Sequence, residues 1–352
     1  MHDQGIIHRY RLLINLPDYA VPVSLNEGNT PLIPLPRLAE ELGGGFDLYV
    51  KFEGLNQTGS FKDRGMTTAI SEALGAGARA VICASTGNTA ASAAAYAARA
   101  GQKAIVLIPQ GKVAAGKLAG AVAYGAQVVQ IDGSFDDALN MVVAISQRQP
   151  IALVNSLNPY RLEGQKTGAF EIVDALGRAP DLFCLPVGNA GNITSYWMGF
   201  QQYNAINGCG LPRILGVQAA GAAPLVLGHP VDKPETVATA IRIGRPARGE
   251  QALQAAEQSG GKIIAVSDDE ILSMQKCLAR EGVWVEPASA AGLAGLAAEV
   301  QAGLRLPCGA QVVVVCTGHG LKDPDIVVRD LPPVTAVPPQ VERLEEVIMQ
   351  GL

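Results

Sequence analysis

The sequence lacks the features that mark several classes of protein. Only 17% of its 352 residues are charged, the formal net charge is −5, and aromatic residues make up 5%. A chain without positive excess offers no electrostatic footprint for nucleic acid or an anionic membrane surface. Its strongly apolar runs, such as residues 312–316, are far shorter than the ~20 residues of a transmembrane helix. The first 18 residues hold no extended apolar block before a small-residue cleavage site, so we expect a cytoplasmic protein.

Cysteine and histidine are few and scattered. The six cysteines form no Cys-x-x-Cys pair and no regular framework, and four lie in or beside apolar stretches, so we expect reduced, buried thiols. The four histidines lie far apart and show no paired ligand spacing. We therefore expect no metal site.

What the chain has is 48% hydrophobic residues and enough length for about two domains with large cores. Short, β-branched runs alternate with alanine-rich helical ones, a pattern typical of parallel sheets covered on both faces. The predicted strands are residues 80–84, 103–108, 127–131, 151–154, 182–187, 213–218, 263–266 and 311–316. Predicted helices include residues 89–101, 113–125, 136–148 and, after a proline-rich segment, 341–350. We expect an α/β protein with a smaller domain over residues 54–148 and a larger domain made of 1–53 plus 149–352.

One lysine stands at a chemically unusual position. Residues 57–64 read Gln-Thr-Gly-Ser-Phe-Lys-Asp-Arg, and Ser60 followed by Asp63 matches a helix-capping signature. The following residues Met66, Ile70, Ala73 and Leu74 recur at helical spacing. Lys62 would then lie in the first turn, where the helix dipole disfavours a positive charge and lowers the lysine pKa, as Schiff-base chemistry requires. Taken alone, Lys62 also fits an exposed surface lysine.

Polar loops follow several predicted strands, at the sheet edge where open parallel sheets bind ligands. Ser85, Thr86, Asn88 and Thr89 follow the strand at 80–84 and open a helix, which suits a carboxylate or an ordinary cap. The segment Gly188-Asn189-Ala190-Gly191-Asn192 follows the strand at 182–187. Its glycines can point backbone N–H groups at one anion, such as a phosphate, although a tight turn explains them equally well.

Two further loops end at the same predicted edge. Thr317 follows the valine run 312–315, where its hydroxyl could bond a heteroaromatic nitrogen without protonating it. Ser156 and Arg161 follow the strand at 151–154, and arginine suits phosphate geometry. Together the four loops and Lys62 call for a cofactor with a phosphate and an aromatic ring, and pyridoxal 5'-phosphate meets these requirements.

At this point a family resemblance is evident. The chain resembles the fold-type II pyridoxal-phosphate enzymes, which include the tryptophan synthase β subunit, and within them the threonine synthase family. The matching motifs, in the family's order, are Thr58-Gly-Ser-Phe-Lys62-Asp-Arg-Gly65, Ala84-Ser-Thr-Gly-Asn88-Thr-Ala-Ala-Ser92, Gly188-Asn-Ala-Gly-Asn192 and Thr317-Gly-His-Gly-Leu-Lys-Asp323. The resemblance implies two open parallel-sheet α/β domains with the cofactor in the cleft between them.

The resemblance also implies a role for each matching residue. Lys62 would be the Schiff-base lysine and proton shuttle, Asn88 would bond the ring hydroxyl, and Thr317 would meet the pyridine nitrogen. The cofactor phosphate would lie on Gly188, Asn189, Ala190, Gly191 and Asn192. The substrate carboxylate would lie on Ser85, Thr86 and Thr89. The substrate phosphate would lie on Ser156, Arg161 and Asn189.

The implied enzyme is a homodimeric lyase of threonine biosynthesis that converts O-phospho-L-homoserine and water to L-threonine and phosphate. Position 57 is Gln where many relatives have proline, which would loosen the turn before Lys62. The alternatives within this fold are a threonine or serine dehydratase and a β-replacement enzyme. A nicotinamide-dependent oxidoreductase is disfavoured because no Gly-x-Gly-x-x-Gly opens a helix. A non-catalytic binder is disfavoured by the retention of Lys62.

Overall fold

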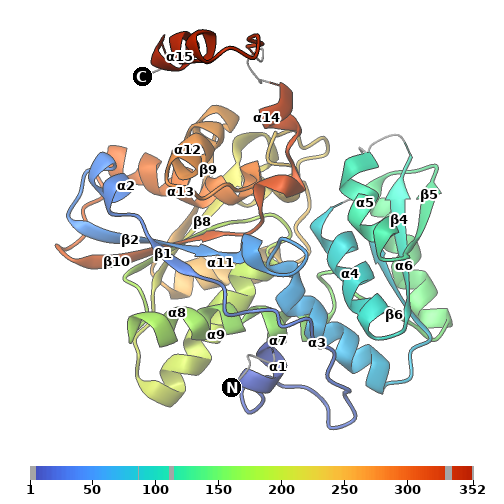
Figure 1. Ribbon diagram of the computed structural model, residues 1–352. Coiled ribbons are helices and arrows are strands. Elements are labelled where there is room, and N and C mark those ends of the chain that lie inside the picture. Colours follow the sequence, from blue (N-terminus) through green and yellow to red (C-terminus); the bar gives the residue numbers. More distant parts are fainter. Residues whose placement is uncertain (1–4, 86, 111–114, 330–334, 351–352) are drawn as a thin grey trace.

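Within the residues that the structure describes, the larger of two sheets has six strands in the order β1-β2-β10-β7-β8-β9 (Figure 1). The computed structural model describes residues 5–85, 87–110, 115–329 and 335–350. The strands are β1 (Leu32–Pro34), β2 (Phe46–Phe52), β7 (Leu182–Pro186), β8 (Arg213–Ala219), β9 (Lys262–Val266) and β10 (Ala310–Cys316). All neighbouring pairs are parallel except β1 with β2.

The second sheet is parallel throughout and has four strands in the order β5-β4-β3-β6. Its strands are β3 (Ala80–Ala84), β4 (Lys103–Pro109), β5 (Gln127–Ile131) and β6 (Ile151–Leu153). β6, which follows residue 148, pairs with β3. In Figure 1 this sheet and its helices stand beside the larger sheet, with α3 (Lys62–Gly75) running along the junction.

Helices cover both faces of both sheets (Figure 1). The remaining α-helices are α1 (Ile6–Arg9), α2 (Pro36–Glu41), α4 (Asn88–Arg99), α5 (Ala115–Ala123), α6 (Phe135–Arg148), α7 (Pro159–Gln165), α8 (Thr167–Leu176), α9 (Gly191–Asn207), α10 (Pro224–Leu227), α11 (Gly249–Gln258), α12 (Asp268–Arg280), α13 (Pro287–Gln301), α14 (Asp325–Arg329) and α15 (Val341–Gln350). Short 3-10 helices are η1 (Glu53–Leu55), η2 (Ala220–Ala222), η3 (Thr239–Ile241) and η4 (Gly320–Lys322). No described helix is both long and apolar enough to cross a membrane.

Successive residues of the central strands enter different cores. Val312 and Val314 of β10 pack with α2, α12 and α13, whereas Val313 and Val315 pack with α8, α9 and α11. In the smaller sheet, Val81 and Cys83 face α3 and α4, while Ile82 and Ala84 face α6. Both faces of these two central strands are therefore apolar, which explains their continuous rather than alternating hydrophobic runs.

The structure confirms the α/β class, and each predicted strand is present with ends that agree within one residue. β1 and β2 were not predicted. β2 lacks a continuous apolar run because Asp47 and Lys51 interrupt it. Lys51 is nevertheless buried, with only 2% of its surface exposed. The predicted core face of α3 is confirmed for Met66, Ile70 and Ala73, all buried, while Leu74 is partly buried.

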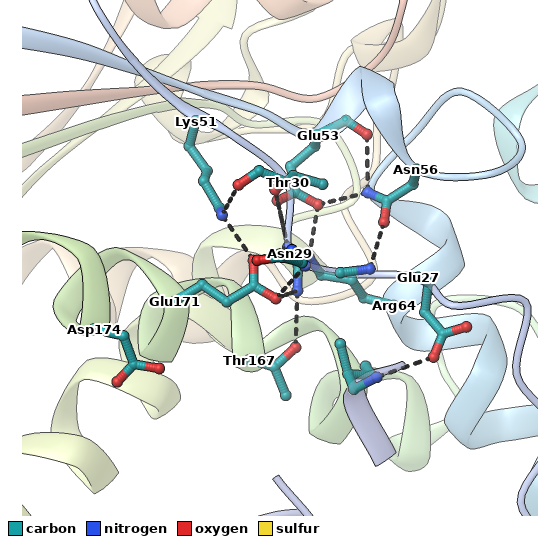
Figure 2. A network of polar contacts seen from close by, with 12 residues as sticks. Glu27, Asn29, Thr30, Lys51, Glu53, Asn56, Arg64, Thr167, Glu171 and Asp174 are labelled. Carbon is teal, nitrogen blue, oxygen red and sulfur yellow. Dashed lines mark hydrogen bonds and ion pairs between the residues drawn. The ribbon is translucent and has the colours of Figure 1, made fainter. Parts of the chain in front are cut away.

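A buried cluster of charges holds the start of α3 to the larger sheet (Figure 2). The Arg64 guanidinium donates to Glu53 at 2.7 and 2.9 Å and to Glu171 of α8 at 2.9 and 2.6 Å. Lys51 of β2 donates to the same Glu171 carboxylate at 2.7 Å. Burial alone raises the pKa of Glu171, but the Arg64 and Lys51 charges outweigh it and hold that pKa well below its usual range. Both carboxylates therefore remain ionised and bind the arginine.

The cluster gives a first prediction. Arg64→Met should lower the free energy of unfolding by about 3–5 kcal/mol, because it leaves two buried carboxylates with too little positive charge. Urea denaturation would measure the loss. Arg178→Met, which breaks an exposed ion pair with Asp181, should cost less than ~1 kcal/mol. Equal losses in the two variants would contradict the assigned importance of the cluster.

Candidate active site

A pocket opens at the carboxyl ends of strands from both sheets and gathers the predicted site residues. It is lined by Lys62 of α3, the loops after β3, β7 and β10, and the segment after β6. The predicted residues that line it are Lys62, Ser85, Asn88, Thr89, Ser156, Arg161, Gly188, Asn189, Ala190, Gly191, Asn192 and Thr317. Thr86 lies outside the described residues. Residues that are 255 positions apart in sequence thus meet in one cavity, as Lys62 and Thr317 do.

Lys62 is the first residue of α3, and its Nζ lies 4.2 Å from the centre of the Phe61 ring. Burial and, after it, the nearby Arg161 charge lower the pKa of Lys62 to about 7, while Glu286 acts in the opposite direction. The expected fall in pKa is therefore present, and burial and Arg161 are two causes of it that the sequence did not reveal. A lysine with this pKa is substantially neutral near pH 7 and can act as a nucleophile and a base.

The predicted capping role of Ser60 is wrong. Phe61 occupies the cap position without a side-chain bond, and the Ser60 hydroxyl is buried with no partner among the described residues. Asp63 instead accepts the Thr58 N–H at 2.7 Å and the hydroxyls of Thr58 and Ser92 at 2.6 Å each. Asp63 therefore ties the turn before Lys62 to both α3 and α4 rather than closing a capping box.

The glycine-asparagine loop has the form of an anion site. Ala190 adopts a left-handed conformation with φ 64° and leads into the 17-residue helix α9, whose first residues line the pocket. Asn192 is 7% exposed, and both its Nδ2 and Oδ1 atoms are buried without a partner among the described residues. The unpaired Nδ2 donor at a helix start suits an anion such as a phosphate.

Thr317 directly follows β10, and Ser289 of α13 orients it. The Thr317 and Ser289 hydroxyls are 2.9 Å apart, and Ser289 also accepts the Gly318 N–H at 2.8 Å. Thr317 is 5% exposed, so its hydroxyl is held in a nearly dry part of the pocket. Such a hydroxyl can form a hydrogen bond with a ring nitrogen without protonating it.

Arg161 is a buried cation without a carboxylate partner among the described residues. It is 1% exposed, its Nε has no hydrogen-bond partner in the described part of the chain, and one terminal nitrogen donates to the Val154 carbonyl at 3.4 Å. Burial lowers the pKa of Arg161 to about 10. The neighbouring Ser156 and Leu157 carbonyls accept from Arg248 at 3.1 and 3.2 Å, which holds this loop in place. An unpaired buried guanidinium is an attractive site for an anionic ligand.

The loop after β3 is held against this anion site. Asn155 donates to the Ala84 carbonyl at 2.9 Å and accepts the Ala84 N–H at 3.0 Å. These bonds hold the loop that begins at Ser85. Ser85 and Thr89 line the same pocket as Ser156 and Arg161.

Sequence reasoning missed several lining residues, among them Glu286, Lys322, Gln165 and Thr239. Lys322 lies within the motif that begins at Thr317, so its place in that motif could have identified it as a site residue. Glu286 has no motif of its own, because it simply precedes Pro287 at the start of α13.

Comparisons with known proteins agree with this geometry. Residues 23–318 match the family model described as "Pyridoxal-phosphate dependent enzyme". The chain is 58% identical over 329 residues to threonine synthase of Synechocystis, covering 93% of this chain and 85% of that protein. It is also 58% identical over 337 residues to threonine synthase of Mycobacterium leprae, covering 95% and 93%.

Solved structures resemble the fold at lower identity. Maize serine racemase has a TM-score of 0.73 at 22% identity and covers 86% of this chain and 91% of its own. Processed threonine deaminase isoform 2 of Solanum lycopersicum has a TM-score of 0.71 at 23% identity and covers 93% and 94%. At these identities the likeness establishes the fold alone.

The chain belongs to the family of pyridoxal-phosphate-dependent enzymes, and within it to the threonine synthases. It is a lyase of threonine biosynthesis, and its cofactor is pyridoxal phosphate. The pocket suits that group, because it combines a lysine of low pKa, a helix start with unpaired amide atoms and a buried threonine hydroxyl.

The lowered lysine pKa makes a second prediction. In enzyme freed of cofactor, the rate at which added pyridoxal phosphate bonds to Lys62 should rise with pH and be half-maximal near pH 7, because only the neutral amine attacks and the pKa is about 7. Stopped-flow absorbance would measure it. Arg161→Gln should move the midpoint to higher pH by removing the adjacent positive charge. A wild-type midpoint near ~10.4, the ordinary lysine value, would contradict the assignment.

Proposed function

We propose that the enzyme converts O-phospho-L-homoserine and water to L-threonine and inorganic phosphate. The observation that supports this proposal is that two separate groups of residues suited to anions line one pocket. One is the start of α9 with Asn192, and the other is Arg161 with Ser156. A phosphorylated cofactor that acts on a phosphorylated substrate needs both sites.

We assign the cofactor to the first site. Gly188, Asn189, Ala190, Gly191 and Asn192 would hold its phosphate with backbone N–H groups and the unpaired Asn192 amide. Lys62 would bond to its aldehyde carbon, Asn88 would contact its ring hydroxyl, and Thr317 would contact its pyridine nitrogen. When bound, the cofactor withdraws electrons from the substrate carbons next to the amine.

The substrate occupies the remainder of the pocket. Its carboxylate would bind Ser85, Thr86 and Thr89, in the loop that Asn155 holds. Its phosphate would bind Ser156, Arg161 and Asn189; the Asn189 Oδ1 accepts the Ala247 N–H at 3.4 Å, which leaves the amide Nδ2 as a donor. Arg161 is well suited, because its charge is buried and unpaired until an anion binds.

Lys62 would then move the protons of the reaction. As a neutral amine it can take the α-proton of the substrate and return protons later, since its pKa of about 7 matches a working pH near neutrality. Arg161 would stabilise the charge of the departing phosphate at the γ-carbon. The buried walls of the pocket would limit water until the β-carbon is ready to accept it.

We also propose the larger organisation of the enzyme. The smaller domain, predicted as residues 54–148, would move against the larger domain, predicted as residues 1–53 plus 149–352, and close over the substrate, because the carboxylate loop and the cofactor phosphate loop belong to different sheets. β6 pairs with β3, so it would move with the smaller domain. A homodimer in the cytoplasm is the assembly and location that the family resemblance supports. Size-exclusion chromatography with light scattering tests the dimer, and a monomer at micromolar concentration would remove it.

The substrate proposal gives a third prediction. Purified enzyme with its cofactor should release threonine and phosphate in equal amounts from O-phospho-L-homoserine, as measured by amino-acid analysis and a phosphate assay. L-Threonine supplied instead should yield little 2-oxobutanoate. Release of 2-oxobutanoate from L-threonine as the only activity would favour a dehydratase and contradict the proposal. Arg161→Gln should raise KM for the phosphorylated substrate by at least about tenfold, because a charge-assisted hydrogen bond is lost.

The role of Thr317 gives a fourth prediction. Thr317→Val keeps the side-chain shape, so the variant should bind the cofactor, but kcat should fall by about tenfold or more because the hydroxyl contact is lost. Steady-state kinetics and cofactor absorbance would measure the two effects. Thr236→Val, a buried threonine that does not line the pocket, is the matched control. An unchanged kcat in Thr317→Val would remove the hydroxyl from the mechanism.

A further inference from the structure

Glu286 is a buried carboxylate in the pocket to which no role has yet been given. It is 3% exposed and lines the cavity together with Lys62, Asn88 and Lys322. It stands at the cap position of α13, where a carboxylate would ordinarily bond the free helix N–H groups, yet its side chain makes no such bond. The carboxylate is turned away from its own helix and toward α4.

The structure makes room for this carboxylate at Gly318. A Cβ atom at position 318 would lie 2.4 Å from Oε1 of Glu286 and 2.7 Å from its Cδ, distances that real side chains do not adopt. The two segments are also joined by the backbone, since the Glu286 N–H donates to the Gly318 carbonyl at 3.2 Å. Gly318 does not have a positive φ, so the requirement for glycine comes from the carboxylate and not from backbone strain.

The carboxylate bonds to the Asn88 amide. Asn88 Nδ2 donates to Oε1 at 2.9 Å and to Oε2 at 3.1 Å. An ionised carboxylate can only accept hydrogen bonds, so it distinguishes the two ends of the amide and opposes its rotation by half a turn. Asn88 is therefore presented to the pocket in one orientation.

We propose that Glu286 is a positioning residue that fixes the orientation in which Asn88 meets the ring hydroxyl of pyridoxal phosphate. The inference rests on the proposed contact between Asn88 and the cofactor. Glu286 acts through Asn88, and Gly318 is glycine because the carboxylate occupies the space of its Cβ. The motif Thr317-Gly318 would thus support two contacts with the cofactor ring. Thr317 would contact the pyridine nitrogen directly, and Gly318 leaves space for Glu286, which orients Asn88 toward the ring hydroxyl.

The environment of Glu286 makes its hydrogen bond with Asn88 sensitive to pH. The pKa of Glu286 is raised to about 7, because burial and, to a smaller extent, Asp323 raise it by more than the Asn88 bond and the Lys322 and Lys62 charges lower it. Above about pH 7 the ionised carboxylate accepts from Asn88 and holds it. Below that pH the protonated carboxyl can itself donate, and the preference for one amide orientation weakens.

The test measures cofactor binding and the absorbance spectrum of the bound cofactor. Apoenzyme is titrated with pyridoxal phosphate, and Kd and the pH dependence of the spectrum are compared among variants. Glu286→Leu should raise Kd by about tenfold, and Gly318→Ala should raise it in the same direction. Glu286→Gln, whose Oε1 still accepts, should restore Kd to within about threefold of wild type while altering the spectrum's pH dependence near 7.

Two further variants complete the design. Glu281→Gln, five residues earlier, removes the negative charge of an exposed ion pair with Arg37 and should leave Kd and spectrum unchanged. Asn88→Ala should raise Kd as Glu286→Leu does, and combining the two should add little, because both remove the same contact.

The outcomes separate the inference from the function on which it rests. A folded Glu286→Leu with wild-type Kd and spectrum would overturn the positioning role, even if Asn88→Ala still weakens binding. If Glu286→Leu does not fold, wild-type Kd in Gly318→Ala with an unchanged pH-dependent spectrum in Glu286→Gln overturns it. An unaffected Asn88→Ala overturns both this inference and the proposed Asn88 contact, whereas the threonine and phosphate assay tests the reaction independently.

Discussion

The interaction on which the rest of the structure depends is the one between Arg64 and two buried carboxylates. Arg64 lies two residues after Lys62 on α3, and its guanidinium binds Glu53 after β2 and Glu171 on α8 (Figure 2). The apolar face of the same helix packs on the smaller sheet. α3 is thus bonded to one sheet by charge and to the other by hydrophobic contact. That double attachment places Lys62 at the meeting point of both sets of loops.

The pocket is built around unsatisfied polar groups. Arg161 is buried without an acid, Asn192 is buried without a hydrogen-bond partner among the described residues, and the Lys62 pKa is lowered by burial. Such groups cost free energy in a folded chain, and a ligand with complementary charge recovers it. Glu286 differs from them, because its buried carboxylate is satisfied by the Asn88 amide.

Sequence reasoning reached most of the fold and of the candidate site for definable reasons. Strands buried on both faces read as continuous apolar runs, and the loops after them carry glycine, asparagine and threonine in unusual density. It failed where a residue's environment reverses its ordinary preference. Lys51 reads as exposed but is buried against Glu171, so β2 was missed, and Ser60 reads as a cap but Asp63 bonds Thr58 and Ser92 instead.

The amino-acid sequence by itself determined the class of fold, the position of Lys62 at a helix start and the composition of the ligand loops, because these follow from local periodicity and turn chemistry. Only the tertiary structure decided which charges meet. The Lys62 pKa depends on burial and on Arg161, 99 residues away, and the Asn88 orientation depends on Glu286, 198 residues away. Electrostatic effects act through space and vary with burial, so sequence spacing carries no information about them.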